Sequence, residues 1–199
     1  MSDSKNLIIS TALKLFLQQS YHQVTMQDIV KATGLSKGAF YHYFSSKEKV
    51  FEEVIEYYFS NSPDEIYKKF DQNTLKGFCK SYVDNVSERI LKYNCEECPG
   101  GLLRANKFAL IFDAMKLLPV FNERQIERKK TEFNYWLAMI EKARENGEIS
   151  TSLSNQEIAK LFIYQYYGTS IYYISRTQVN DLIAEIKEQI EVIYNMIKS

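Results

Sequence analysis

Turn-forming residues are scarce in this chain. It has only 7 Gly and 3 Pro in 199 residues. A sheet built from hairpins needs more of them, because each tight connection between strands uses such residues. Apolar residues make up 45% of the chain and charged residues 25%, the usual balance for a folded globular protein. The scarcity of turn residues therefore predicts an all-α fold.

Apolar periodicity divides the predicted helices into a short set and a long set. The short helices cover about 5–19, 25–33 and 37–43, and a fourth begins at a capping box of Ser45 with Glu48. From about residue 62 onward the periodic segments are longer. We expect about nine helices, arranged as a helix-turn-helix head in residues 1–46 and a helical bundle in residues 47–199.

The segment 25–43 has the local signals of two helices joined by a sharp turn. Thr25 and Ser36 are helix N-cap residues, and Gly34 between them can adopt a positive φ without steric cost. On the second helix Phe40 and Phe44 are spaced i, i+4 and face inward. The outward surface is then formed by Ser36, Lys37, Gly38, Tyr41 and His42. A cation, hydroxyl groups and a bare glycine on a first turn suit a helix that enters a DNA major groove.

The charge distribution agrees with this interpretation. Residues 1–50 carry six lysines and three acidic residues, a net charge of +3, in a chain whose formal net charge is zero. Lys47 lies at the start of the fourth helix, where backbone N–H groups favour an anion such as a DNA phosphate. A small basic head on a mildly acidic body is typical of a module that binds a polyanion.

Three segments of the head resemble the tetracycline-repressor (TetR/AcrR) family of bacterial transcription regulators. They are ALKLF (12–16), TMQDIVKATGLSKGAFYHYF (25–44) and SKEKVFEEVI (46–55). The resemblance implies a DNA-binding head, a ligand-binding and dimerising helical body, and a repressor that binds a pseudo-palindromic operator. Two positions depart from the family pattern: Ser20 replaces a glycine after the first helix, and Val30 replaces an alanine.

The resemblance assigns roles to residues of the head. Lys37, Gly38, Tyr41 and His42 would lie at the groove, with Ser36 and Tyr43 beside them. Thr25, Gln27 and Lys47 would contact flanking phosphates. The partners implied are a double-stranded DNA operator, a second copy of this chain and a small-molecule effector of aromatic or apolar character.

Two further sets of residues lie in the predicted body. The resemblance favours a ligand pocket lined by some members of an otherwise core-forming set: Tyr82, Phe108, Phe112, Met115, Trp136, Ile140 and Tyr166. Isoleucines of the last helix alternate in spacing by three and four, and Gly168 interrupts the helix before it. With the resemblance, this predicts a dimer interface of Phe162, Gln165, Gly168, Thr169, Tyr172, Ile186, Ile190, Ile193 and Ile197.

The sequence offers little support for an enzyme or a metal protein. Cys95 and Cys98 have the spacing of a zinc or redox pair, but a structural zinc site needs four ligands and the chain has no second pair. We predict no cofactor, no catalytic site and no membrane segment, and a cytoplasmic location. The alternative is a helical-bundle sensor of a small molecule, thiol or metal, or an enzyme, with a non-functional DNA-binding head.

Overall fold

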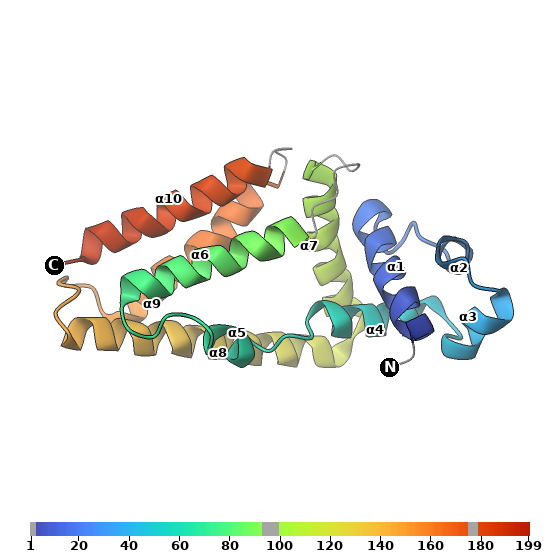
Figure 1. The fold of residues 1–199 in the computed structure, drawn as a ribbon, viewed down its shortest axis with the longest axis horizontal. Coiled ribbons are helices and arrows are strands. Elements are labelled where there is room, and N and C mark those ends of the chain that lie inside the picture. Colours follow the sequence, from blue (N-terminus) through green and yellow to red (C-terminus); the bar gives the residue numbers. More distant parts are fainter. Residues whose placement is uncertain (1–2, 93–99, 175–178) are drawn as a thin grey trace. The chain divides into compact units, whose positions relative to one another are not determined.

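The computed structural model describes residues 3–92, 100–174 and 179–199 (Figure 1). These residues form ten helices, with a single antiparallel bridge pair, Ile149–Lys198, as their extended structure. The all-α prediction is confirmed. The helix missing from the prediction is α5 (Pro63–Tyr67), which begins with Pro63 and a capping box of Ser62 and Glu65. Within the described residues, no helix has both the length and the apolar character needed to cross a bilayer.

The helices belong to two compact units. The head unit contains Met1–Ser60 and Leu102–Arg124, and the body unit contains Asn61–Gly101 and Gln125–Ser199. The helices of the head unit are α1 (Asp3–Gln19), α2 (Met26–Thr33), α3 (Lys37–Tyr43), α4 (Lys47–Tyr58) and nearly all of α7 (Gly100–Leu117). The body unit holds α5, α6 (Leu75–Lys92), most of α8 (Pro119–Glu145), α9 (Asn155–Tyr172) and α10 (Val179–Ile197).

Aromatic rings fill the centre of the head unit. The ring centroid of Phe16 on α1 lies 5.5 Å from that of Tyr21 and 5.8 Å from that of Phe51 on α4. Tyr21 and Phe51 are 4.3 Å apart. Phe40 and Phe44 are also buried, as the i, i+4 spacing predicted. These contacts hold α1 against α4, and apart from Phe40 and the half-buried Tyr43 the residues of α3 are exposed.

Two turns of the head differ in detail from the prediction. The N-cap of α4 is Ser46, whose hydroxyl accepts the backbone N–H of Lys49, so the predicted capping box of Ser45 with Glu48 is wrong by one residue. Ser20 has φ 72°, in the left-handed region that glycine adopts without strain. The turn is therefore formed by a serine at a steric cost of about 1–2 kcal/mol.

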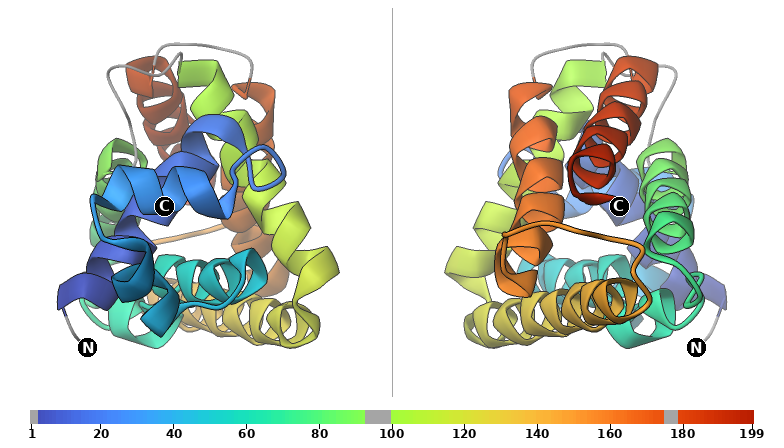
Figure 2. Two further views of the ribbon diagram at one scale, coloured as in Figure 1. Left: turned by 90° about the vertical axis from the view of Figure 1, so that its right-hand side faces the viewer. Right: turned by 90° about the vertical axis from the view of Figure 1, so that its left-hand side faces the viewer.

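The body unit is built around Trp136 of α8. Its ring stacks on Phe162 of α9 at 4.6 Å and meets the edges of Phe78 and Tyr82 of α6. Figure 2 shows α10 in red between α9 and α6, both of which it contacts. The carboxylate of Glu148 caps α6 by accepting the backbone N–H groups of Leu75 and Lys76 at 2.8 and 2.9 Å.

Candidate nucleic-acid interface

Side-chain caps set the start of both helices of the motif. The Thr25 hydroxyl accepts the N–H of Asp28 at 3.2 Å, and the Asp28 carboxylate accepts the N–H of Thr25 at 2.8 Å. The side-chain and backbone hydrogen bonds from Thr25 lower the pKa of Asp28. Ser36 caps α3 by accepting the N–H of Ala39, and Gly34 at φ 68° makes the turn between the helices. The predicted caps and glycine turn are confirmed.

One face of α3 is exposed and carries the residues predicted for the groove. Ser36, Lys37, Gly38, Tyr41 and His42 are all exposed, and Tyr41 keeps 47% of its surface accessible. A Cβ added to Gly38 would meet no atom within 4 Å, so its bare backbone faces open space. Figure 1 shows α2 and α3 of the head as short consecutive helices. The chemistry available on this face is a cation, two rings with polar groups and an accessible backbone.

The residues predicted for flanking phosphates lie at the starts of two helices. Thr25 and Gln27 are exposed at the N-terminus of α2, where unpaired N–H groups favour an anion. Tyr43 is half-buried beside His42, with their ring centroids 5.1 Å apart. Contacts of these residues with DNA stay a prediction.

Lys47 has a structural role that the sequence did not indicate. Its Nζ donates to the carbonyl oxygens of Tyr21 and Val24 at 3.0 and 3.1 Å, and it lies 4.3 Å from the centre of the Tyr21 ring. Both carbonyls belong to the loop between α1 and α2. Because an ammonium has three N–H groups, the two carbonyls leave one donor for another acceptor. Lys47 therefore braces this loop, and a phosphate contact would come in addition.

We expect Lys47→Met to lower stability by about 1–2 kcal/mol, because two carbonyls lose a charged donor while the aliphatic stem is kept. For a chain of this size that corresponds to a fall in Tm of roughly 2–8 °C. The matched control is Lys49→Met on the same helix, where the exposed lysine pairs with Glu52 at 2.8 Å. If Lys47 also contacts phosphate, the salt slope of DNA binding falls by about 0.9 per protomer. Unchanged melting would contradict the bracing role.

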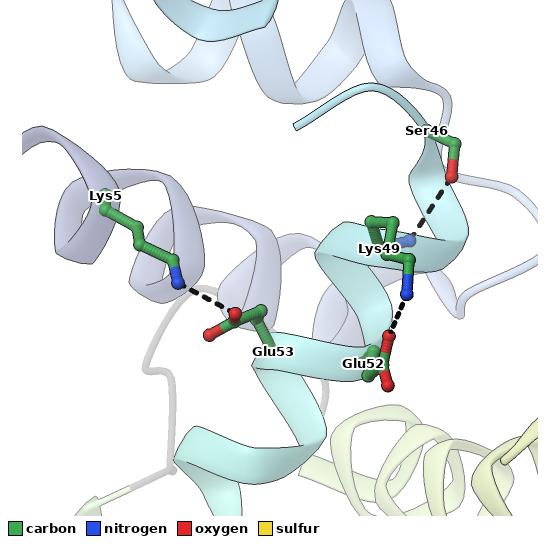
Figure 3. A network of polar contacts seen from close by, with 5 residues as sticks. All are labelled: Lys5, Ser46, Lys49, Glu52 and Glu53. Atoms are coloured by element: carbon green, nitrogen blue, oxygen red, sulfur yellow. Dashed lines mark hydrogen bonds and ion pairs between the residues drawn. The ribbon is translucent and has the colours of Figure 1, made fainter. Parts of the chain in front are cut away.

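Figure 3 shows two ion pairs and the N-cap of α4. Lys5 of α1 pairs with Glu53 of α4 at 2.7 Å, and both side chains are partly buried. Lys49 pairs with Glu52 one turn earlier on α4, and Ser46 caps the helix. The exposed pair contributes about 0.2–1 kcal/mol at most. The Lys5–Glu53 pair joins the first and fourth helices and fixes the register between them.

Two polar side chains of α7 contact the end of α1 and the loop after it. Asn106 is buried and donates its Nδ2 to the carbonyl oxygen of Leu17 at 2.9 Å. Asp113 is buried and its Oδ1 lies 3.2 Å from Nε2 of His22. Sequence reasoning missed both residues. The available signal was an asparagine and an aspartate seven residues apart, on one face of a helix rich in apolar residues.

The residues predicted for the ligand pocket do not form one group. Tyr82, Trp136 and Ile140 are buried in the core of the body unit, and Tyr166 packs against Tyr82 with ring centroids 6.1 Å apart. The other three lie on α7 in the head unit: Phe108 is half-buried, and Phe112 and Met115 are exposed. The structure therefore brings together Tyr82, Trp136 and Tyr166, with Ile140 in the same core.

Most apolar residues predicted for the dimer interface face the interior of one copy. Phe162, Ile186, Ile190 and Ile197 are at most 2% exposed, and Ile193 packs against the same core. The interface assignment of the four buried residues is corrected, because a buried side chain cannot contact a second copy while it fills the core; Ile193 is half-buried, and its place in an interface stays a prediction. The alternating spacing of the α10 isoleucines is explained by this packing within one copy.

The remaining predicted interface residues lie elsewhere on α9. Gly168 and Tyr172 are exposed, and Gln165 donates to the hydroxyl of Thr169 at 3.2 Å. Several other apolar side chains of α9 and α10 are exposed: Leu161, Tyr164, Ile171, Val192 and Met196. These residues form the apolar surface of α9 and α10.

The cysteine pair Cys95 and Cys98 lies outside the described residues. The third cysteine, Cys79, is buried in the body core, and burial raises the pKa of its thiol. Its thiolate is therefore disfavoured near neutral pH, and this residue acts as a small apolar side chain.

The family model for bacterial regulatory proteins of the tetR family matches residues 8–54, the segment that contains α2, α3 and most of α1 and α4. In this segment the chain is similar to the tetR family. The match covers the whole motif, including the exposed face of α3 and the caps at Thr25 and Ser36.

Curated proteins similar to this chain match it mainly in the head. The uncharacterised HTH-type regulator YuxN of Bacillus subtilis is 45% identical over 62 residues, which are 31% of this chain and 21% of that protein. IcaR of Staphylococcus epidermidis, named as a negative transcriptional regulator of the biofilm operon icaADBC, is 28% identical over 92 residues, 44% of this chain and 50% of its own length. The match thus spans between about a fifth and a half of these relatives.

Solved structures share the fold over nearly the whole chain. NemR of E. coli in its reduced form aligns with a TM-score of 0.65 at 17% identity, covering 98% of each chain. SmeT in complex with triclosan aligns with a TM-score of 0.69 at 13% identity, covering 100% of this chain and 93% of SmeT. At this level of identity the likeness shows the fold alone.

Proposed function

We propose that this chain is a tetR-family transcriptional repressor that binds a pseudo-palindromic DNA operator as a homodimer and is released by a small-molecule effector. The observation that supports it most is the exposed face of α3, with Lys37, Gly38, Tyr41 and His42 around the buried Phe40. This face lies within the segment that matches the family. The relative IcaR is named as a negative regulator, which favours repression over activation.

In this proposal the two parts of the sequence have separate tasks. Residues 1–46 bind DNA, and residues 47–199 dimerise and bind the effector. Release requires the effector to bind the DNA-incompetent state more tightly than the DNA-bound state. The complex of SmeT with triclosan provides a precedent for a small molecule on this fold. The chain then works as a cytoplasmic regulator and not as an enzyme.

The proposed dimer uses the apolar surface of α9 and α10 around Gly168. Four of its side chains, Tyr164, Ile171, Tyr172 and Met196, are more than half exposed in one copy. Exposed apolar side chains gathered on neighbouring helices are typical of a surface that another protein covers. A two-fold axis through this surface would form a four-helix bundle from two copies.

Duplex binding as a function of salt tests the DNA-binding proposal. We expect log K for the protein's operator to fall linearly with log salt, by about 0.9 for each phosphate contacted. Tyr41→Ala should lose about 1.5–3 kcal/mol of affinity per protomer if its hydroxyl binds a phosphate, because hydrogen bonds to charged groups are of this strength. Its Tm should stay near the wild-type value, since the side chain is exposed.

Tyr57→Ala is the matched control, because Tyr57 of α4 is 44% exposed and lies outside the predicted DNA face. It should leave operator affinity unchanged. Equal losses in both variants would contradict a specific role for Tyr41. A protein that binds no duplex at low salt, after selection against a random DNA library, would overturn the proposed function.

A further inference from the structure

Glu132 of α8 accepts hydrogen bonds from the hydroxyl groups of two tyrosines on neighbouring helices. Its Oε1 accepts from Tyr67 of α5 at 2.7 Å, and its Oε2 accepts from Tyr167 of α9 at 3.2 Å. Burial and then the charge of Glu132 raise the pKa of both tyrosines, so their hydroxyls stay protonated near neutral pH and act as donors. The carboxylate of Glu132 thus already binds phenolic hydroxyl groups.

The two tyrosines are held to different degrees. Tyr67 is buried, and its ring centroid lies 4.9 Å from that of Phe70 and 5.3 Å from that of Tyr135. Tyr167 is 38% exposed, and its hydrogen bond to Glu132 is the longer one. A long O–H···O bond from a partly solvated side chain is weak. The hydroxyl of Tyr167 can therefore be exchanged for that of another molecule, whereas Tyr67 stays in place.

A circuit of ring contacts runs from Tyr167 into the core of the body unit. Tyr167 lies 5.3 Å from Tyr166, measured between ring centroids, and Tyr166 lies 6.1 Å from Tyr82. Tyr82 in turn lies 5.1 Å from Trp136. Trp136 is four residues after Glu132 on α8, so both side chains lie on one face of that helix and the circuit leads back to Glu132. We call this set the Glu132 site: Tyr82, Glu132, Trp136, Tyr166 and Tyr167.

The end of the Glu132 site in the core holds a donor without a partner. Trp136 is fully buried, and its Nε1 is one of the buried polar atoms of the described residues that have no hydrogen-bond partner. Buried N–H groups are nearly always paired, so this donor suits an acceptor atom supplied by a ligand. Four residues of helix rise about 6 Å, which is close to the span of a benzene ring with two para substituents. An acceptor para to a hydroxyl group therefore matches the separation of Trp136 and Glu132 along α8.

We propose that the Glu132 site binds the effector as a neutral phenol that carries a hydrogen-bond acceptor para to its hydroxyl group. The hydroxyl donates to Glu132 in place of Tyr167, and the acceptor takes the N–H of Trp136. The ring of the ligand packs edge-on or offset against Tyr82 and Tyr166, as aromatic pairs do. The proposal rests on the proposed function, and it narrows the aromatic or apolar effector that the sequence predicted to one chemical class.

Three probes of similar shape separate the two hydrogen bonds. Para-hydroxyacetophenone has both groups, para-methoxyacetophenone lacks the hydroxyl donor, and para-ethylphenol lacks the carbonyl acceptor. Their affinities are measured by isothermal titration calorimetry on the full chain, at a pH where the phenols are neutral. Loss of the donor should weaken binding at least about tenfold, because hydrogen bonds to a charged group are strong. Loss of the acceptor should weaken it by about threefold or more.

Tyr167→Phe distinguishes exchange at Glu132 from simple loss of a contact. It removes the competing hydroxyl and keeps the ring, so affinity for para-hydroxyacetophenone should rise by about threefold or more. Glu132→Gln should remove most of the preference for the hydroxyl probe over the methoxy probe, because it removes the charge and keeps the shape. The matched control is Glu127→Gln, an exposed glutamate on the same helix, which should bind all three probes like the wild type.

The indole N–H of Trp136 reports the second hydrogen bond directly. Trp136 is the chain's one tryptophan, so a proton–nitrogen correlation spectrum contains a single indole peak. We expect this peak to move downfield with para-hydroxyacetophenone, whose carbonyl accepts the N–H, and not with para-ethylphenol. Equal movement with both probes refutes the role of Trp136.

Three results would overturn the proposal: equal affinity for the hydroxyl and methoxy probes, binding of no probe, or no gain of affinity in Tyr167→Phe. Thermal melts show that each variant is folded, and a gain of affinity cannot arise from unfolding. Operator binding is measured on the same samples with and without para-hydroxyacetophenone. A phenol that leaves operator binding unchanged is not the effector class, whereas a wild-type protein that binds no operator refutes the proposed function.

Discussion

The Gly38→Ala variant will bind its operator at least about tenfold more weakly than the wild type, a loss of about 1.4 kcal/mol. A Cβ at this position meets no atom of the chain within 4 Å, so the methyl group has space in the free protein. A backbone that approaches DNA closely would lose that contact. Alanine should also stabilise α3 by roughly 0.5–1 kcal/mol, because glycine is a poor helix former.

The opposite signs of the two effects make the Gly38 experiment informative. Fluorescence anisotropy with operator DNA measures the affinity, and a thermal melt measures the stability. A graded series with Gly38→Leu should weaken binding further, in proportion to side-chain size. If affinity stays at the wild-type level in both variants, α3 does not bring its backbone close to DNA, and the groove assignment for this residue is wrong.

The Gly168→Leu variant will be largely monomeric at concentrations where the wild type is a dimer. A Cβ added at the exposed Gly168 meets no atom within 4 Å inside one copy, so we expect a larger side chain to clash with a second copy rather than with its own. Overpacking of a well-fitted contact costs about 1–3 kcal/mol, and a two-fold axis applies that cost twice. We therefore expect the dimer dissociation constant to rise by about two orders of magnitude.

Sedimentation equilibrium measures this change directly. The control is Glu141→Leu, which adds the same side chain to an exposed position of α8 and should leave the dimer intact. Operator affinity should fall with the dimer, because two half-sites a helical turn apart require two linked heads. A Gly168→Leu protein that remains dimeric with unchanged affinity would place the interface elsewhere.

Local signals in the sequence were sufficient for the helix-turn-helix. Thr25, Gly34 and Ser36 act on neighbouring backbone groups, so their identities alone predict the caps and the turn. The i, i+4 spacing of Phe40 and Phe44 likewise separated the buried from the exposed side of α3. The N-cap of α4 was predicted one residue too early, because Ser45 and Ser46 have the same side chain and only the backbone conformation shows which of them caps the helix.

Tertiary contacts could not be predicted in the same way. Lys47 bonds carbonyls 26 and 23 residues earlier in the chain, and no short-range pattern encodes that partner. An apolar stripe shows that a helix packs against something, but not whether the partner is the same copy or a second one. This is why Ile186, Ile190 and Ile197 were assigned to an interface although they lie in the core.

The place of α7 in the head unit determines how the head of this chain can be transferred to a related protein. Residues 102–124 pack with the head, although more than forty residues separate them from its last helix. A chimera with a single junction after α4 would transfer the head without α7. The carbonyl oxygen of Leu17 would then lose its hydrogen bond from Asn106, and His22 would lose its contact with Asp113. The graft would expose the surface that α7 covers and leave polar groups unmatched. A head transferred between relatives therefore needs two crossovers, so that the distant helix travels with the residues it contacts.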